Sequence, residues 1–306
     1  MASADAQPVA VAATARRPSA SARLLRRLTR QPAGLAAGIV LLAVFVVGAL
    51  VPVITPHSGL VIHLADRWRN RAPLTLGGWH FVGTDGIGRD VAVRTLWGLH
   101  YSEQSAVLAT VLATLIGVAI GGIAGYRGGW PDALLMRLAD MLGMFPALLL
   151  MLAIFTWFQP VTVFKATIIL ACYLWIPAAR VVRAEISSLK NREFVQTALS
   201  LGATDRWIFF RHLLPNASSS IIVAATSLLG QVIMLEATVE FFSLGVTAEI
   251  RPTLGNLIGD GQRNEIALGY GWWNWAAPAV LLVVILVCSN LVGDGVADAL
   301  RPTRRR

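Results

Sequence analysis

Long apolar runs alternate with short polar segments along this chain. A helix needs roughly 20 apolar residues to cross a hydrocarbon core of about 30 Å. The pattern therefore predicts an all-α integral membrane protein with six transmembrane helices, at residues 33–54, 104–126, 135–158, 161–179, 217–244 and 272–293. Lys165 and Pro177 lie near the two ends of the fourth run. We keep this run as a span because a lysine side chain can reach the membrane surface.

The segments outside the spans differ in character. Residues 1–20, rich in alanine, serine and proline, are predicted to be a disordered tail. In residues 21–32, leucines at helical spacing among arginines predict a helix lying at the membrane surface. The first apolar run is too long for a signal peptide and no A-x-A-like cleavage site follows it, so we expect a retained anchor. Residues 55–103 are predicted to form an external loop with short helices, residues 104–293 the core, and residues 294–306 a basic tail.

Composition supports a membrane protein and indicates its orientation. The chain is 56% hydrophobic and 14% charged, whereas soluble domains carry about 25% charged residues. The net charge of +9 is dispersed between the apolar runs, so it favours membrane orientation over nucleic-acid binding. Lysine and arginine are more abundant in the regions that would be cytoplasmic if both termini were inside, which predicts that topology. Tryptophans at 272, 273 and 275 fit an aromatic belt at the outer surface.

Small residues recur every four positions in the second apolar run. Gly117, Gly121 and Gly125 fall on one face of the predicted helix, leaving it nearly bare of side chains. Another backbone can therefore approach this face closely. The approaching helix could belong to the same subunit or to a partner membrane subunit.

A charged segment, NREFVQTALSLGATDRWIFFRHLLP at 191–215, interrupts the apolar sequence. It predicts a helix from Glu193 to Leu201, which Gly202 ends in a left-handed conformation. Thr204 can cap a second helix with an acid in its first turn, and Pro215 is expected to close the unit. So short a unit cannot bury all of its aromatic residues. The segment therefore predicts an exposed apolar patch and a protein partner.

The same segment resembles the cytoplasmic loop of bacterial ABC importers, whose pattern is EAA-x3-G-x9-I-x-LP. Gln196-Thr197-Ala198 stands at EAA, Gly202 at the glycine and Leu214-Pro215 at LP. REFVQTALSLGATD, FFRHLLPN and VGTDGIGRD (82–90) are similar to words of the peptide-permease branch, as are later segments up to NLVGDGVADALRP. Over about residues 30–302 the chain resembles the C-type membrane permease subunit of dipeptide/oligopeptide (peptide/nickel) ABC importers.

The resemblance implies a type I ABC importer permease (MetI-like) fold in the bacterial plasma (inner) membrane. It implies a transmembrane permease subunit that imports di- or oligopeptides together with a second homologous permease. Two ABC ATPase subunits, or one fused protein, would use ATP and Mg, and an extracytoplasmic peptide-binding protein would deliver the cargo. The subunit itself would bind no cofactor. Docking to the ATPases would involve Glu193, Phe194, Gln196, Thr197, Ala198, Gly202, Ala203, Thr204, Asp205, Arg206, Phe209, Leu214 and Pro215.

No pattern in the chain predicts catalysis. The only lysines, Lys165 and Lys190, follow Phe164 and Leu189, so a phosphate-binding loop of the G-x-x-x-x-G-K-[ST] type is excluded. The histidines of the first outer loop (His57, His63, His80, His100) have no compact metal-ligand spacing. The two cysteines, Cys172 and Cys288, lie in apolar runs and predict no disulfide.

Two further groups of residues carry hypotheses. Glu236 and Glu240, four apart in the fifth run, share one helix face, where they could bond between helices or line the pathway and attract an ammonium group. Thr84, Asp85, Gly88, Arg89 and Asp90 suit a turn that enters the next helix. By the family likeness this outer turn could seal the external mouth or meet the binding protein.

Three alternatives stay open at the level of sequence. A nickel or nickel-chelate importer is the nearest, since close relatives of the resembled family carry nickel. An ATP-independent secondary transporter would often show repeated halves with broken helices, and the sequence shows no such repeat. A membrane-anchored scaffold would not need acids inside a span.

Overall fold

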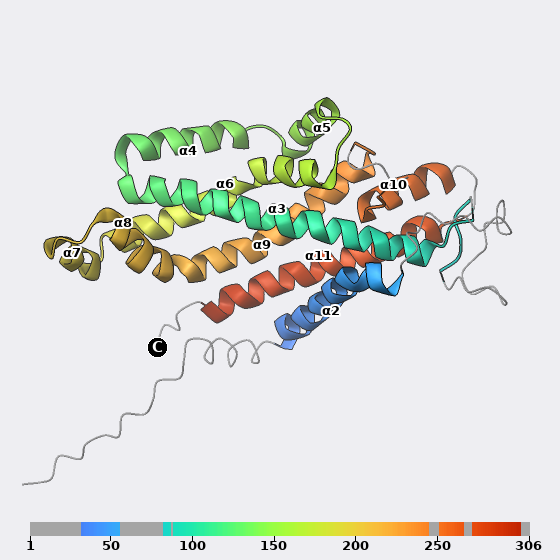
Figure 1. Ribbon diagram of the computed structural model, residues 1–306, viewed down its shortest axis with the longest axis horizontal. Helices are drawn as coiled ribbons and strands as arrows, with labels where there is room; N and C mark the ends of the chain where they lie inside the picture. The colour runs from blue at the N-terminus through green and yellow to red at the C-terminus, as the bar shows by residue number, and fades with distance from the viewer. Residues whose placement is uncertain (1–31, 56–81, 87, 245–250, 266–270, 301–306) are drawn as a thin grey trace, which may run out of the picture.

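The computed structural model describes residues 32–55, 82–86, 88–244, 251–265 and 271–300. The predicted disordered tail, surface helix, most of the external loop and residues 301–306 lie outside the described residues. The described chain is helical throughout, apart from an isolated β-bridge (Figure 1). Its elements are α2 (Pro32–Ile54), α3 (Val91–Arg127), α4 (Gly129–Gly143), α5 (Ala147–Trp157), α6 (Val163–Lys190), α7 (Glu193–Ser200), α8 (Asp205–Ile208), the π-turn η2 (Phe209–Leu213), α9 (Leu214–Phe241), α10 (Leu254–Glu265) and α11 (Trp273–Leu300).

Five helices in the described part of the chain are long and apolar enough to cross a membrane: α2, α3, α6, the continuous α8–α9 and α11. A sixth crossing requires α4 and α5 to act together, and these two are bent by 85° at their junction. The span predicted at 135–158 is therefore made of two helices with a break between them. The break falls just before Pro146, where the residue preceding a proline disfavours the helical conformation.

Several helices extend beyond the predicted spans. α3 begins at Val91 rather than at residue 104, because the Asp90 side chain caps it by accepting from the amide of Val93 at 3.0 Å. α6 continues through Pro177 to Lys190, and α11 includes residues 294–300 of the predicted basic tail. Hydropathy detects the part of a helix that lies in lipid, so polar extensions at either end escape it.

The longest contact in the bundle joins α3 to α6, which lie side by side in Figure 1. The small-residue face of α3 permits it: a Cβ placed on Gly121 would lie 2.3 Å from the carbonyl oxygen of Ala179. A Cβ on Gly117 would lie 2.7 Å from the Cβ of Ala178, and one on Gly125 would lie 2.6 Å from the carbonyl oxygen of Arg183. The predicted close packing is therefore confirmed, and the approaching helix belongs to the same subunit.

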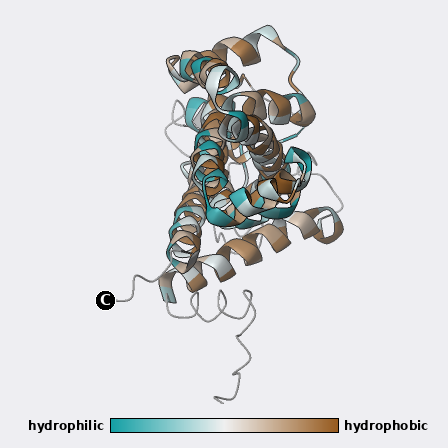
Figure 2. Ribbon diagram, turned by 90° about the vertical axis from the view of Figure 1, so that its left-hand side faces the viewer, coloured by the Kyte–Doolittle hydropathy of each residue, from teal (hydrophilic) through white to brown (hydrophobic). Residues whose placement is uncertain are grey.

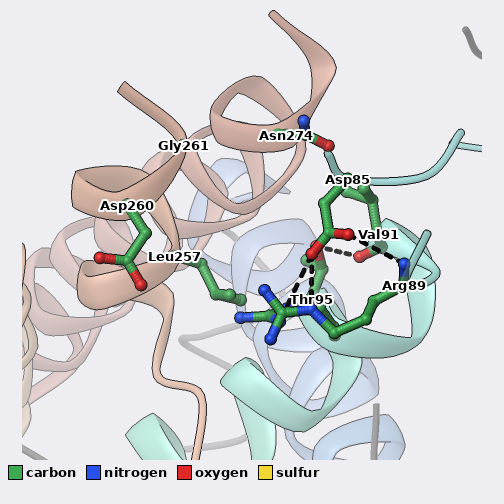
Figure 3. Close-up of a pocket in the computed structure, with 9 residues that line it drawn as sticks. Asp85, Arg89, Val91, Thr95, Leu257, Asp260, Gly261 and Asn274 are labelled. Atoms are coloured by element: carbon green, nitrogen blue, oxygen red, sulfur yellow. Dashed lines mark hydrogen bonds and ion pairs between the residues drawn. The ribbon is translucent and has the colours of Figure 1, made fainter. Parts of the chain in front are cut away.

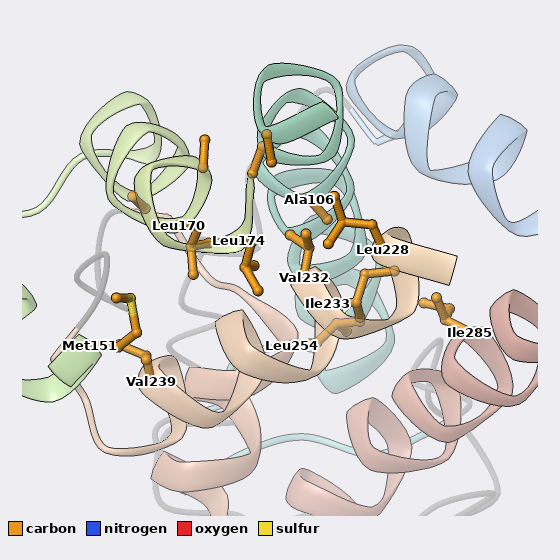
Figure 4. Packing of buried hydrophobic residues seen from close by; sticks show 14 of the residues in the cluster. Ala106, Met151, Leu170, Leu174, Leu228, Val232, Ile233, Val239, Leu254 and Ile285 are labelled. Carbon is orange, nitrogen blue, oxygen red and sulfur yellow. The ribbon is translucent and has the colours of Figure 1, made fainter. Parts of the chain in front are cut away.

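The hydrophobic core lies where α3, α6, α9 and α11 converge. Leu170 and Leu174 of α6, Val232 and Ile233 of α9 and Ile285 of α11 are buried there (Figure 4). α2 packs outside this group against α11 and α3. Figure 2 shows hydrophobic (brown) stretches of ribbon interspersed with hydrophilic (teal) ones along the helices.

Candidate functional site

The segment at 193–214, here called the coupling element, lies at one end of the bundle, at the left of Figure 1. α7 ends in a motif built around Gly202, whose φ is +80°. The amide of Gly202 donates to the carbonyl of Leu199 at 2.9 Å, and the amide of Ala203 donates to that of Ala198 at 3.1 Å. This pair of bonds is a Schellman motif, which satisfies the last carbonyls of a helix. The predicted glycine C-cap is therefore confirmed.

The second helix starts as predicted and then departs from the prediction. Thr204 accepts from the amide of Trp207 at 3.4 Å, and Asp205 lies in the first turn. Pro215 does not close the unit, because α8, η2 and α9 form one 37-residue helix from Asp205 to Phe241. The π-turn brings the amide of Leu214 to the carbonyl of Phe209, a wider spacing that relieves the usual clash of a proline with the preceding turn.

A small hydrophobic cluster fixes the coupling element to the bundle. Val195 and Ala198 of α7 are buried against Val182 and Ile186 of α6. From the second helix of the element, Ile208 and Leu213 are fully buried in the same cluster. The element is therefore packed against the ends of α6 and α9.

Two residues predicted for ATPase docking lie on this inner side. Ala198 is only 9% exposed, and Phe209 packs on Gly122 and on the ring of Tyr126, 6.1 Å away. Both contact the bundle, and Phe209 stays partly exposed beside Phe210 in the lining of a cavity of about 390 Å³.

Polar contacts tie the same element to the end of α3. The Tyr126 hydroxyl donates to the Asp205 carboxylate at 2.7 Å. Lys190 donates to the backbone carbonyl of Tyr126 at 2.6 Å, and its ammonium group lies 5.4 Å from the centre of that ring. Three helices, α3, α6 and α9, thus hold the element in place.

The outer side of the coupling element exposes large apolar side chains. Leu201 is 82% exposed, and Phe210, Trp207 and Phe194 are also exposed. The other predicted docking residues on this side are polar and exposed, and they include Glu193, Gln196, Thr197 and Arg206. Leu201, Trp207 and Phe210 were missing from the predicted docking residues. The position of Leu201 directly before the helix-ending Gly202 could have identified it.

At the other end of the bundle, residues 82–86 and 88–90 form a tight turn that leads into α3. Thr84 and Asp90 form an antiparallel bridge, and the Asp85 carboxylate accepts from both the amide and the side chain of Arg89, at 2.8 and 2.6 Å. The indole of Trp273 donates to the carbonyl of Thr84 at 3.1 Å, which pins the turn to the start of α11. The predicted turn into a helix is therefore confirmed.

A small cavity of about 50 Å³ lies beside this turn (Figure 3). Asp85 and Arg89 lie on one side of it, Asp260 of α10 on the other, and Asn274 of α11 at one end. Arg94 is 5% exposed and reaches Asp85 at 3.5 Å. The turn, α10 and α11 are thus joined by a largely buried polar cluster.

The two acids of α9 are buried inside the subunit. Glu236 and Glu240 are 3% and 1% exposed. The Ser105 hydroxyl of α3 donates to Glu236, a bond between helices of the kind considered above. Ser102, one turn earlier in α3, accepts from the amide of Leu254 at the start of α10, at 3.1 Å. This region therefore joins α3, α9 and α10.

Of the four histidines predicted in the first outer loop, His100 alone is among the described residues, and it lies in α3. Its Nδ1 bonds to the carbonyl of Gly48 of α2 at 2.8 Å, and the Gln104 amide bonds to its Nε2 at 2.9 Å. Within the described ranges, no group of three His, Cys, Asp or Glu side chains could hold a metal ion. His100 is thus a structural link between α2 and α3.

Comparisons with known proteins all point to components of membrane transport systems. Residues 117–306 match the family described as binding-protein-dependent transport system inner membrane component. The chain is 38% identical over 227 residues to the oligopeptide transport system permease protein OppC of Bacillus subtilis, covering 74% of this chain and 73% of that protein. It is 36% identical over 287 residues to OppC of Mycobacterium tuberculosis, covering 92% and 94%.

Other relatives support the same family and fold. The dipeptide transport system permease protein DppC of Bacillus subtilis is 34% identical over 283 residues, covering 92% of this chain and 85% of that protein. Among solved structures, a chain of the MetNI methionine ABC transporter in an inward-facing conformation aligns with a TM-score of 0.54 at 19% identity. The alignment covers 69% of this chain and 97% of that one, and it supports the fold.

Proposed function

This chain belongs to the family of binding-protein-dependent transport system inner membrane components, and from that premise we propose how it works. It is the non-catalytic permease subunit of an ABC importer for oligopeptides or dipeptides, as its relatives OppC and DppC are named. A second homologous permease completes the pathway, two ABC ATPases hydrolyse ATP, and an extracytoplasmic binding protein delivers peptide.

One observation carries the mechanical part of this proposal. The coupling element has an exposed apolar outer side and an inner side locked to the bundle. The exposed side, with Leu201 and Trp207, suits docking to an ATPase, because an apolar patch at the end of a membrane bundle needs a partner. The buried inner residues Val195, Ile208 and Leu213 transmit any displacement to α6 and α9. ATPase closure would therefore shift both helices together.

The orientation follows from the same reasoning. The coupling element is cytoplasmic, as are both termini, and residues 82–90 lie outside. The excess of lysine and arginine on the proposed cytoplasmic side supports this topology. The external turn at 82–90 would then face the binding protein or close the outer mouth, held there by Trp273.

Substitution of Gly202 tests the proposal. A Cβ at this glycine would meet no atom within 4 Å, so Gly202→Val acts only through the left-handed backbone, which a β-branched residue tolerates poorly. We expect ATP-dependent uptake of a radiolabelled tripeptide by the reconstituted complex to fall at least about tenfold. Gly202→Asn, a residue that tolerates this conformation, should retain most uptake.

The control measurements separate coupling from folding. Membrane insertion and co-purification of the second permease should stay unchanged in Gly202→Val, because no packing contact is altered. Uptake equal to that of the unsubstituted transporter would contradict the coupling role. Full peptide transport by this subunit alone, in vesicles without any ATPase, would contradict the proposed function as a whole.

A further inference from the structure

Two cavities lie along the groove between α6 and α9. One, of about 490 Å³, is lined by small and neutral residues that include Ser220 and Ser227. The other, of about 570 Å³, is lined by residues that include Thr238 and Met234. Both cavities are lined by Gln231 of α9 and by Pro177 of α6, so they are neighbours along one groove. Each has the size of a site for a small organic ligand.

The polar residues of α9 in this groove form a stripe. Ser220, Ser227, Gln231 and Thr238 are separated by seven, four and seven residues, which places them on one face of an α-helix. From Ser220 to Thr238 the helix rises about 27 Å, close to the thickness of the hydrocarbon core. The stripe thus offers hydrogen-bonding groups across the whole bilayer.

A polar stripe of this length would be unfavourable if it faced lipid. Ser220 donates to Glu185 of α6 at 2.9 Å and Thr238 to the carbonyl of Met234 at 2.7 Å. An amide or hydroxyl group that makes no such bond in hydrocarbon costs on the order of 1–3 kcal/mol. Gln231 and Ser227 are nevertheless exposed on the surface of the subunit. Polar groups at this depth are found where a helix faces a water-filled cavity or a partner.

Two charged side chains border the groove among the described residues. Arg180 lines the second cavity and is paired with Asp140 at 2.8 Å. Glu185 of α6 accepts from the Ser220 hydroxyl at 2.9 Å, at one end of the stripe. Glu240 lies nine residues after Gln231, about two and a half turns, and hence on the opposite face of α9. The buried acids therefore do not contribute to this surface.

α6 contributes backbone polarity on the facing side. Pro177 has no amide hydrogen, so the carbonyl of Tyr173 lacks the donor that an uninterrupted helix would supply. Tyr173 and Pro177 both line the second cavity. The Tyr173 carbonyl is thus a candidate acceptor for a peptide amide on the α6 side of the groove.

We propose that this groove is the part of the translocation path formed by this subunit, and that it binds the backbone of an extended peptide through the neutral stripe of Ser220, Ser227, Gln231 and Thr238. This inference rests on the proposed function. Hydroxyl and carboxamide groups can both donate and accept, which suits the N–H and C=O groups shared by all peptides. Because Arg180 is paired with Asp140 and Glu185 is bonded to Ser220, the middle of the stripe at Ser227 and Gln231 is neutral, and it accepts cationic, neutral and anionic peptides alike.

Thiol accessibility tests whether the groove is aqueous. In a Cys172→Ala background, Ser227→Cys and Gln231→Cys are compared with Val283→Cys, an exposed apolar position on α11. In the reconstituted complex, a membrane-impermeant methanethiosulfonate reagent should modify the two stripe cysteines at least about tenfold faster, because a thiol in lipid does not ionise. Trialanine with its binding protein and ATP should slow their modification. Equal rates at all three positions, or crosslinking of the stripe cysteines to the second permease, would overturn the proposal.

Charge introduced into the stripe tests the specificity. Gln231→Glu should raise the uptake of trilysine relative to triglutamate by at least about fivefold, because a carboxylate at this depth attracts cations with little screening. Glu236→Gln, on the buried side, should leave this ratio unchanged. An unaltered ratio in Gln231→Glu while ATP-dependent uptake persists would overturn this inference without affecting the proposed function. If the unsubstituted complex took up no peptide in the presence of ATP, the proposed function itself would be overturned.

Discussion

The contact between α3 and α6 gives a sharp prediction for Gly121→Ala. The added methyl group would lie 2.3 Å from the carbonyl oxygen of Ala179, which is part of the α6 backbone and cannot rotate away. Optimal contact requires about 3.5 Å, so the two helices must separate locally by roughly 1 Å. The substitution therefore disturbs the most extensive helix contact of the subunit.

Two opposing effects set the magnitude. Overpacking in a close-packed interior costs about 1–3 kcal/mol, since a separation of this size forfeits a quarter to a half of the attraction of each affected atom pair. Replacing glycine by alanine inside a helix returns up to about 1 kcal/mol. We expect a net destabilisation of about 1–2 kcal/mol, equivalent to a fall of roughly 2–8 °C in Tm.

Thermal unfolding of the detergent-solubilised transporter, followed by intrinsic fluorescence, measures this change. Gly38→Ala in α2 is the matched control, because its added methyl group would meet only a side-chain carbon of Val292 at 3.8 Å. That variant should be as stable as the unsubstituted protein or slightly more so. If Gly121→Ala unfolded at the same temperature as Gly38→Ala, the close approach of the two backbones would be refuted.

Two further predictions concern the ends of the bundle. Thr204→Ala removes the cap of α8, which should destabilise that turn by about 1 kcal/mol and accelerate amide hydrogen exchange at 205–208. Thr197→Ala loses only a bond to the carbonyl of Glu193 within its own helix, so it should leave exchange at 205–208 unchanged. Equal exchange at 205–208 in both variants would contradict the capping role. Trp273→Phe removes the bond to Thr84 and should weaken the external turn by about 1 kcal/mol, measured as faster exchange at 82–90. Trp272→Phe, at an exposed neighbour, is its control, and protection unchanged in both would show that the indole bond does not hold the turn.

Local signals in the sequence predicted the turns of the candidate site well. Gly202 ends α7 and Thr204 starts α8 because these effects depend on the backbone geometry of a few consecutive residues. Asp90 likewise caps α3 where the predicted external turn ends. The same reasoning failed at Pro215, because a π-turn accommodated the proline and let the helix continue.

The direction in which side chains face was harder to predict. Ala198 and Phe209 match the family motif or its surroundings, yet both point into the bundle, where α3 and α6 supply their contacts. Glu236 and Glu240 are the only charged residues in the predicted fifth span, and the structure buries both of them. The neutral stripe on the opposite face gives no strong signal in the sequence, since serine, threonine and glutamine occur widely in apolar helices.

The sequence by itself determined the membrane class, most of the spans, the family and the helix–glycine–helix element. Each of these depends on composition, local periodicity or a contiguous motif, and those properties survive without knowledge of the neighbours. The tertiary structure alone decided which helix packs on the glycines of α3, which side of the coupling element stays exposed and which face of α9 borders a groove. These outcomes depend on contacts between segments far apart in the chain. The type of a residue limits which partners it can bind, but only the fold determines which partners lie next to it.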